Sequence, residues 1–474
     1  MSGLPSSLAN APLRVVDGFG MAVRAACRCL APRDAGELAE LLARATREGM
    51  SVAFRGSGRS YGDPAINASG LVIDTTGMNR ILSWDPTTGV VDVEPGVTIE
   101  GLWRRTLPDG FWPAVVPGTM APTLAGCAAM NVHGKNNFKV GPTGDHVLEF
   151  DLAAPDGRTY TCSRDQNEDV FHAAIGGFGA LGAFTRLRLR LKHVESGLLE
   201  VEAIRNRTLE EAFDIFEQRL PAADYLVGWI DGTASGRSLG RGVIHQANYL
   251  TADRDPEGPA KTLRIARQDL PSTILGFPRS LVWHFMAPFM TAPGLWWLNT
   301  AKYFASYLSR PGRKYLQSHA AFAFLLDYVP NWRLAYGRAG FIQYQPFVPH
   351  GAARRVFREI LERCRARGTP PYLVVLKRHR PDPFLLTHGL DGWSLAMDFP
   401  ARQREQLWAL CHELTEIVVA AGGKFYFAKD AVLRPTDVER AFGRDRLDRF
   451  FAVKRRLDPQ GLIRSDLMRR VLPA

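Results

Sequence analysis

Hydrophobic and polar positions alternate along the N-terminal part of the chain in a way that predicts short strands and helices in turn. Apolar runs typical of strands cover Leu71–Asp74 and His146–Leu152. A helical period with Asp34 at its start predicts a helix over Ala35–Glu48. This pattern continues to about Glu195 and indicates one mixed α and β region.

Beyond Glu195 the apolar runs become richer in aromatic residues. Strand patterns cover Tyr225–Ile230, Gly340–Val348 and Tyr372–Lys377, and a helical pattern occupies Arg402–Ala421. Strands separated by helices in this order predict an antiparallel sheet backed by helices. The expected fold class is therefore α+β.

Composition narrows the class of protein. With 474 residues, 46% of them hydrophobic and 23% charged, the chain is long enough for two or three folded domains. The net charge is +11, but basic and acidic residues are interleaved and no nucleic-acid motif occurs, so we expect no nucleic-acid partner. Six scattered cysteines lack zinc-site spacing and predict no metal. The first ten residues do not resemble a secretory signal, which predicts a cytoplasmic protein.

One apolar stretch, Ile274–Leu298, stands apart from this ordinary composition. It is interrupted by Pro278, Arg279 and Pro288, so it cannot provide the ~20 uninterrupted apolar residues of a membrane-spanning helix. Tryptophans mixed with cations are typical of a segment that lies on a membrane surface or contacts a lipid tail. A buried core segment or an oligomer contact explains the same composition, and the sequence leaves these alternatives open.

Two glycine-rich segments carry the candidate chemistry. The first, residues 55–63, contains Gly56, Gly58 and Gly62, which can adopt backbone angles closed to other residues and turn successive N–H groups toward one anion. The second, residues 117–126, leads into a polar cluster at residues 131–136. One segment would hold a pyrophosphate and the other would approach a ring system, which predicts a flavin site.

A nicotinamide-binding Rossmann fold is the rival interpretation. A G-x-G-x-x-G pattern occurs at Gly177, Gly179 and Gly182, but it follows a helical pattern and precedes a strand pattern. The dinucleotide fingerprint requires the opposite order. We therefore interpret these glycines as a tight turn from helix to strand.

These motifs resemble the vanillyl-alcohol oxidase/p-cresol methylhydroxylase family of flavoproteins, and within it the oxidases of polyprenyl-phosphate pentoses. The matching segments run almost from end to end and include residues 58–63, 117–119, 133–136, 340–345, 426–430 and 458–470. The resemblance implies a two-domain FAD-binding p-cresol methylhydroxylase-type fold. Residues 1–195 and the C-terminal return, 423–474, would form the FAD-binding domain, with an antiparallel-sheet substrate domain, 196–422, inserted between them.

The resemblance also implies site residues. His133 and Lys429 would be catalytic, and Lys135, Gln345 and Lys377 would bind substrate. The residues implied around FAD are Phe54, Arg55, Gly56, Ser57, Gly58, Arg59, Ser60, Tyr61, Gly62, Asp63, Gly118, Thr123, Leu124, Ala125, Gly126, Met130, Asn131, Val132, His133, Phe184 and Tyr426. Alcohol oxidation supports such roles, because a hydride must leave for the flavin while a base takes the hydroxyl proton.

Two departures from the family pattern matter. Many sugar oxidases of this family attach flavin to a histidine of the first glycine loop, and this chain has Arg59 there, so we expect non-covalent FAD. An asparagine and a cysteine of the family pattern are replaced by Ser394 and Ala396. Both replacements fall on the substrate side.

The leading functional hypothesis is FAD-dependent oxidation of a secondary alcohol of a polyprenyl-phosphate pentose to a keto sugar. By resemblance this would be the first half of an epimerisation feeding cell-envelope arabinose synthesis, with a short-chain reductase partner and peripheral contact at the inner face of the plasma membrane. The first alternative is a soluble oxidase of aldonolactones, such as D-arabinono-1,4-lactone, or of alditols. The second is a non-catalytic membrane-surface protein that keeps the flavin fold.

Overall fold

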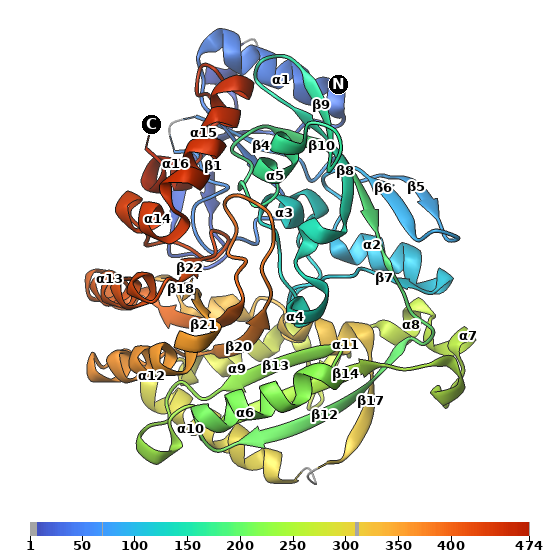
Figure 1. The fold of residues 1–474 in the computed structure, drawn as a ribbon, viewed down its shortest axis with the longest axis vertical. Helices are drawn as coiled ribbons and strands as arrows, with labels where there is room; N and C mark the ends of the chain where they lie inside the picture. The colour runs from blue at the N-terminus through green and yellow to red at the C-terminus, as the bar shows by residue number, and fades with distance from the viewer. Residues whose placement is uncertain (1–6, 69, 309–311, 474) are drawn as a thin grey trace.

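The computed structural model describes residues 7–68, 70–308 and 312–473. In Figure 1 the blue N-terminal part and the red C-terminal helices share one half of the molecule, and the green to orange strands of one large sheet occupy the other half. Residues 1–6, on which the expectation about a secretory signal partly rests, lie outside the described residues.

The half that contains both ends of the described chain is built on two sheets. One is a four-stranded sheet in the order β1 (Leu13–Asp17), β2 (Arg24–Leu30), β4 (Leu71–Asp74) and β3 (Val52–Arg55). The other is a five-stranded antiparallel sheet in the order β5 (Ile81–Asp85), β6 (Val90–Val93), β10 (Ala183–Arg190), β8 (Val147–Ala153) and β9 (Thr159–Ser163). A separate two-stranded sheet pairs β7 (Phe111–Trp112) with β11 (Lys192–His193).

The second half is one large antiparallel sheet. Its strands run in the order β17 (Lys314–Ser318), β12 (Leu198–Asn206), β14 (Gly242–Tyr249), β13 (Tyr225–Ile230), β20 (Val374–His379), β21 (Gly392–Pro400), β19 (Pro346–Pro349) and β22 (Lys424–Phe425), and β18 (Phe341–Tyr344) also pairs with β21. The antiparallel sheet expected beyond Glu195 is thus present. The domain boundaries expected at residues 195 and 422 stay predictions. Strand β22 lies beyond residue 422 in the sequence, yet it pairs with β19 and so belongs to the large sheet.

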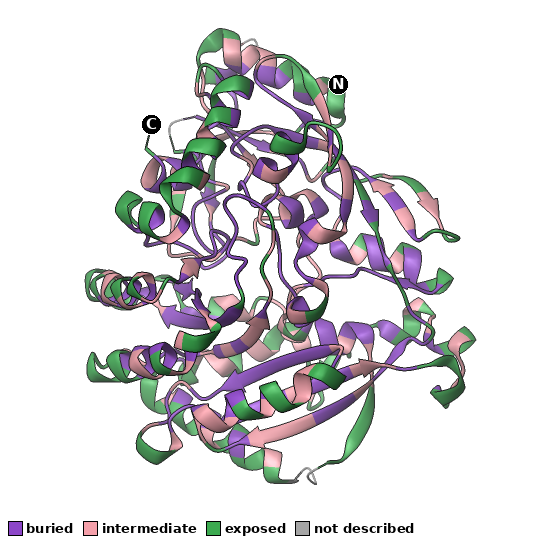
Figure 2. Cartoon of the chain, in the orientation of Figure 1, coloured by how far each residue is buried: buried purple, intermediate pink, exposed green. Residues whose placement is uncertain are grey.

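Helices pack around these sheets and their connections. In the first half they are α1 (Ala35–Glu48), α2 (Ile99–Thr106), α3 (Leu124–Ala129), α4 (Asn137–Val140), α5 (Glu168–Ala174), α14 (Pro435–Phe442), α15 (Arg444–Leu457) and α16 (Asp466–Val471). Along the large sheet and its connections they are α6 (Leu209–Arg219), α7 (Pro259–Thr262), α8 (Ile265–Gln268), α9 (Val282–Met286), α10 (Ala292–Ala305), α11 (His319–Ala323), α12 (His350–Ala366) and α13 (Arg404–Ala420). Figure 2 shows their exposed faces outside and buried residues on the strands beneath.

The local patterns give most of these elements correctly. Helix α1 has the expected bounds because the Asp34 side chain accepts from the Glu37 N–H at its start, and Gly49 ends it at a φ of 61°. The expected strand over Gly340–Val348 is divided into β18 and β19. Pro346 has no amide hydrogen to donate, so the ladder is interrupted at Gln345.

Candidate active site

The two glycine-rich segments converge on one cavity of about 410 Å³ between the two halves of the molecule. They touch directly, since a Cβ added to Gly56 would overlap the Thr123 hydroxyl. The turn at Phe178, Gly179 and Gly182 lines the same cavity. It does connect α5 to β10, as its pattern indicates, but it also contributes to the site.

The three glycines of the first segment serve different purposes. Gly58 has a φ of 65°, a left-handed conformation that favours glycine. Gly56 and Gly62 have no positive φ, so the expectation of special backbone angles is wrong for these two. At these two positions neighbouring atoms leave no room for a side chain. A Cβ on Gly62 would overlap the backbone carbonyl of Asp430.

The first segment fits an anionic cofactor. Within the described part of the chain, the N–H groups of residues 56–60 donate to no protein acceptor, although these residues line the cavity. Successive unpaired N–H groups on a glycine turn form a concave site for a phosphate or pyrophosphate. Apolar side chains such as Phe54, Phe184 and Tyr426 line the same cavity and provide surface for a flat ring system.

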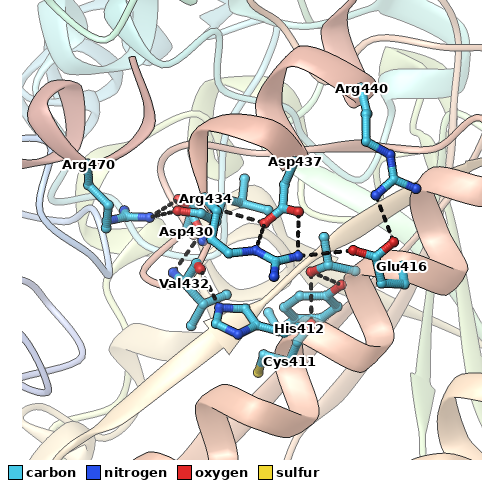
Figure 3. A network of polar contacts seen from close by, with 12 residues as sticks. Cys411, His412, Glu416, Asp430, Val432, Arg434, Asp437, Arg440 and Arg470 are labelled. Carbon is cyan, nitrogen blue, oxygen red and sulfur yellow. Dashed lines mark hydrogen bonds and ion pairs between the residues drawn. The ribbon is translucent and has the colours of Figure 1, made fainter. Parts of the chain in front are cut away.

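A buried ion cluster fixes the C-terminal segment against this loop. Arg470 on α16 donates to Asp63 at 2.7 and 2.9 Å and to Asp430 at 2.9 Å. Figure 3 shows Arg470 directed at Asp430, with the neighbouring Arg434, Asp437 and Glu416 joining α14 to α13. The Tyr61 N–H also donates to the Ala428 carbonyl at 2.8 Å. Lys429 is therefore held next to the first glycine segment.

Lys429 lies at the cavity with its amine 3.6 Å from the centre of the Tyr61 ring. Burial lowers the pKa of Lys429 to about 7, and Lys377 adds to this effect while Asp398 opposes it. Burial likewise raises the pKa of Asp398 to about 7. One oxygen of Asp398 accepts from Gln343 at 2.5 Å, and the other has no partner among the described residues. The two groups act on each other, since the charge of Lys429 lowers the pKa of Asp398 and the charge of Asp398 raises the pKa of Lys429.

Further lysines line the same cavity. The pKa of Lys377 is lowered to about 8 by burial, and its amine has no hydrogen bond or ion pair within the described residues. The amine of Lys135 is hydrogen-bonded to the carbonyls of Phe322 and Ala323, and burial lowers its pKa to about 7. Lys302 on α10, 4.1 Å from the Trp229 ring, was not predicted from the sequence. Loss of contact between the amine and bulk water lowers its pKa to about 8, although the residue as a whole is exposed.

His133 lies in the cavity wall among Phe347, His379, His388 and Tyr426. Burial lowers its pKa well below the usual range, and the charges of Lys377 and Lys429 act in the same direction. His133 is therefore neutral at physiological pH. Its Nε2 lies 3.0 Å from the amide nitrogen of Gln345.

The structure brings nearly all of the predicted site residues to this cavity. Those that line it include all five of the predicted catalytic and substrate residues, His133, Lys429, Lys135, Gln345 and Lys377. Three predicted FAD residues do not line it.

Each of these three has another role. Asp63 pairs with Arg470, Leu124 packs into the main core, and Asn131 binds the Gly144 N–H and Asp382. Sequence reasoning missed Phe19, Trp229 and Lys302, which line the cavity from segments that carry no recognised motif. It also missed Gln343, which lies in the matching segment 340–345 but was given no role there.

The stretch Ile274–Leu298 is largely exposed, so the buried-core alternative is wrong for most of it. We call its exposed side chains, together with a neighbouring one on α10, the apolar face; they are Leu275, Phe277, Leu281, Phe285, Phe289, Trp296, Trp297 and Phe304. Trp296 and Trp297 are 53% and 59% exposed. None of the helices in the described residues has the length and apolar character needed to cross a membrane.

Comparison with known proteins agrees with this site. Residues 28–163 match the family described as FAD binding domain. The chain is 30% identical over 459 residues to the decaprenylphosphoryl-β-D-ribose oxidase of Mycolicibacterium smegmatis, and the match covers 96% of each chain. It is 30% identical over 389 residues to an uncharacterized protein of Streptomyces coelicolor, covering 79% of this chain and all of that one.

Another match covers a smaller share of the chain. Cytokinin dehydrogenase 7 of Oryza sativa subsp. japonica is 33% identical over 195 residues, which is 38% of this chain and 36% of the dehydrogenase. The expectation of FAD is confirmed by these matches, and the residues around the cavity fit that cofactor. The non-catalytic alternative is not supported. The chain belongs to the vanillyl-alcohol oxidase/p-cresol methylhydroxylase family and is an FAD-dependent oxidoreductase.

Proposed function

We propose that this oxidoreductase converts a secondary alcohol of a polyprenyl-phosphate pentose to a ketone. The observation that carries the proposal is one cavity in which lysine amines with lowered pKa values face the two flavin segments. The similarity to a decaprenylphosphoryl-β-D-ribose oxidase over 96% of both chains supports the substrate class.

Lys429 is the base in this proposal. Bound FAD supplies the acceptor for the hydride that leaves the carbinol carbon. Lys429 takes the hydroxyl proton, which a neutral amine with a pKa of about 7 can do at physiological pH. The negative charge of Asp398 raises the pKa of Lys429, so the amine does not become too weak a base. FAD is held without a covalent bond, since Arg59 occupies the position of the tethering histidine.

Lys377 and Lys302 bind the substrate phosphate in this proposal. Both amines line the cavity on the side of the large sheet, and Lys377 has no protein partner among the described residues. An ammonium group is a good phosphate partner. The phosphodiester of such a substrate carries one negative charge, which raises the pKa of each amine back toward its usual value and so favours the charged form that binds it.

In this proposal the apolar face contacts the lipid chain of the substrate. Lys302, in the cavity, and Trp297, on the apolar face, lie on the same helix α10, so the phosphate site and the exposed aromatic side chains are structurally connected. We place the protein at the inner face of the plasma membrane as a peripheral protein. Replacing Trp296 and Trp297 together by serine should weaken binding to anionic vesicles on the order of 10-fold. Unchanged vesicle binding in a sedimentation assay would remove the membrane contact from the proposal.

The keto sugar has a chemical consequence. A ketone formed at one carbon can be reduced from its opposite face, which inverts that carbon, so the reaction fits the first half of an epimerisation that supplies arabinose to the cell envelope. A short-chain reductase would complete it.

Anaerobic mixing of the yellow protein with lipid-linked and free sugars tests the substrate class. Loss of flavin absorbance with polyprenyl-phosphate pentoses, and none with free pentitols or aldonolactones, is the expected result. Rapid bleaching by free alditols or aldonolactones would instead establish the soluble oxidase.

A further inference from the structure

A line of buried polar side chains runs from α4 through the large sheet to His133. Its members are Asn137, His379, Ser394 and Gln345, and each is at most 5% exposed. His379 Nδ1 lies 3.0 Å from Asn137 Oδ1, and His379 Nε2 lies 2.7 Å from the Ser394 hydroxyl. The amide nitrogen of Gln345 lies 3.1 Å from that hydroxyl and 3.0 Å from His133 Nε2.

The direction of every hydrogen bond in this line follows from its first member. The backbone N–H of Arg380 donates to Asn137 Oδ1, and a backbone N–H can only donate, so the oxygen of the Asn137 amide faces His379. His379 must therefore carry its proton on Nδ1. Burial, His388 and Lys377 lower the pKa of His379 well below its usual range, so the ring is neutral and its Nε2 accepts.

The donor and acceptor roles of Ser394, Gln345 and His133 then follow in turn. The Ser394 hydroxyl donates its single proton to His379 Nε2, so toward Gln345 it can only accept. Gln345 thus presents its NH₂ group, with one hydrogen for Ser394 and the other for His133 Nε2. His133, also neutral, must carry its proton on Nδ1. That atom is buried and has no partner among the described residues.

We propose that Asn137, His379, Ser394 and Gln345 hold His133 as the neutral tautomer protonated at Nδ1, so that His133 donates a hydrogen bond to the bound cofactor or substrate and does not accept the substrate proton. Ser394 and His379 are then positioning residues that act through Gln345. This assigns the proton transfer to Lys429 and makes His133 a fixed donor in the cavity wall. The tautomer rests on the hydrogen-bond geometry together with the neutral state of His379 and His133, and only the kinetic consequence rests on the oxidation proposed above.

The tautomer is measured directly by ¹⁵N NMR of the FAD-loaded protein labelled in histidine, with His133→Gln used to assign the signals. We expect a pyrrole-type Nδ1 and a pyridine-type Nε2 for His133, unchanged between pH 6 and pH 9. Ser394→Ala should mix the tautomers, while Ser394→Thr, which keeps the hydroxyl, should retain the single form. A pyrrole-type Nε2, an imidazolium in this range, or an unaltered tautomer in Ser394→Ala would overturn the proposal.

A second measurement identifies the acceptor and separates this inference from the proposed substrate. If Nδ1–H donates to the cofactor, Ser394→Ala shifts the flavin absorbance and weakens FAD binding before any sugar is added. If it donates to the substrate, the resting spectrum is unchanged and flavin reduction by a polyprenyl-phosphate pentose slows on the order of 10-fold, with recovery in Ser394→Thr. Equal flavin spectra and equal rates of flavin reduction in the unaltered protein, Ser394→Ala and Ser394→Thr would contradict a donor role for His133. Failure of every sugar to bleach the flavin would count against the proposed function and leave the NMR result standing.

Discussion

The two sides of the cavity differ in the chemical groups that form them: backbone groups on one side and side chains on the other. The cofactor side, formed by the glycine segments, is made of backbone, with unpaired N–H groups at residues 56–60 and neighbours that leave no room for a Cβ. The substrate side, formed by Lys377, Lys429 and their neighbours, is made of side chains whose pKa values are displaced by burial. Changes on the first side should affect cofactor loading, and changes on the second should affect chemistry and its pH dependence.

The largest effect is expected on the cofactor side. Gly62→Ala places a methyl group on the Asp430 carbonyl and separates the C-terminal segment from the glycine loop, at a cost of about 1–3 kcal/mol of stability. We expect protein that purifies without FAD, measured as the ratio of flavin to protein absorbance. Gly351→Ala, in α12 with open space around it, is the matched control and should stay fully loaded. A yellow Gly62→Ala protein would show that the close contact is not required.

On the substrate side the largest effect should come from Lys429. Lys429→Met removes the proposed base while FAD stays bound, so reduction of the flavin by substrate should slow by about 10²- to 10⁴-fold. Stopped-flow absorbance measures this rate. Lys314→Met, at an exposed pair with Glu200, is the control and should react normally. Normal reduction in Lys429→Met would take this lysine out of the mechanism.

A smaller effect is expected at Lys377. Lys377→Met should weaken binding of a phosphate-bearing substrate by about 10- to 100-fold, since a hydrogen bond to a charged group contributes about 1.5–3 kcal/mol. The substrate concentration dependence of flavin reduction gives this value. The maximal rate should change far less, and an equal loss with a substrate analogue that lacks phosphate would place Lys377 elsewhere in the reaction.

The smallest expected effect is a shift in pH dependence. The base must be neutral, so the rate should fall as the pH falls through the pKa of Lys429, near 7. The Asp398 carboxylate raises that pKa, and Asp398→Asn removes the charge while an amide oxygen can still accept from Gln343. The acid limb should therefore move to lower pH in the variant. A limb that stays in place, or moves to higher pH, would mean that another group controls it.

The sequence predicts the cofactor side well because its signals are local. The glycine spacing, the bounds of α1 and the strand β4 can all be read from neighbouring residues. The three predicted FAD residues that do not line the cavity sit between residues that do, and the turn or helix at each position directs their side chains elsewhere.

The substrate side was predicted less completely. Lys302 and Trp229 reach the cavity from a helix and a strand with no motif, and their role depends on how the large sheet folds around it. The link from His379 to His133 depends in the same way on the pairing of β20 with β21. The apolar composition of residues 274–298 does not by itself distinguish a core from a surface, and only the folded structure shows these side chains exposed.

The ion cluster at Arg470 has a consequence for how the protein assembles. Asp63 and Arg470 are 407 positions apart, so this contact closes a very long loop, and the entropic cost of closing it falls once the large sheet between them in the sequence has folded. We therefore expect the cofactor site to be among the last parts of the molecule to become ordered during refolding. Added FAD should then speed recovery of native protein little, yet protect it strongly against unfolding once bound.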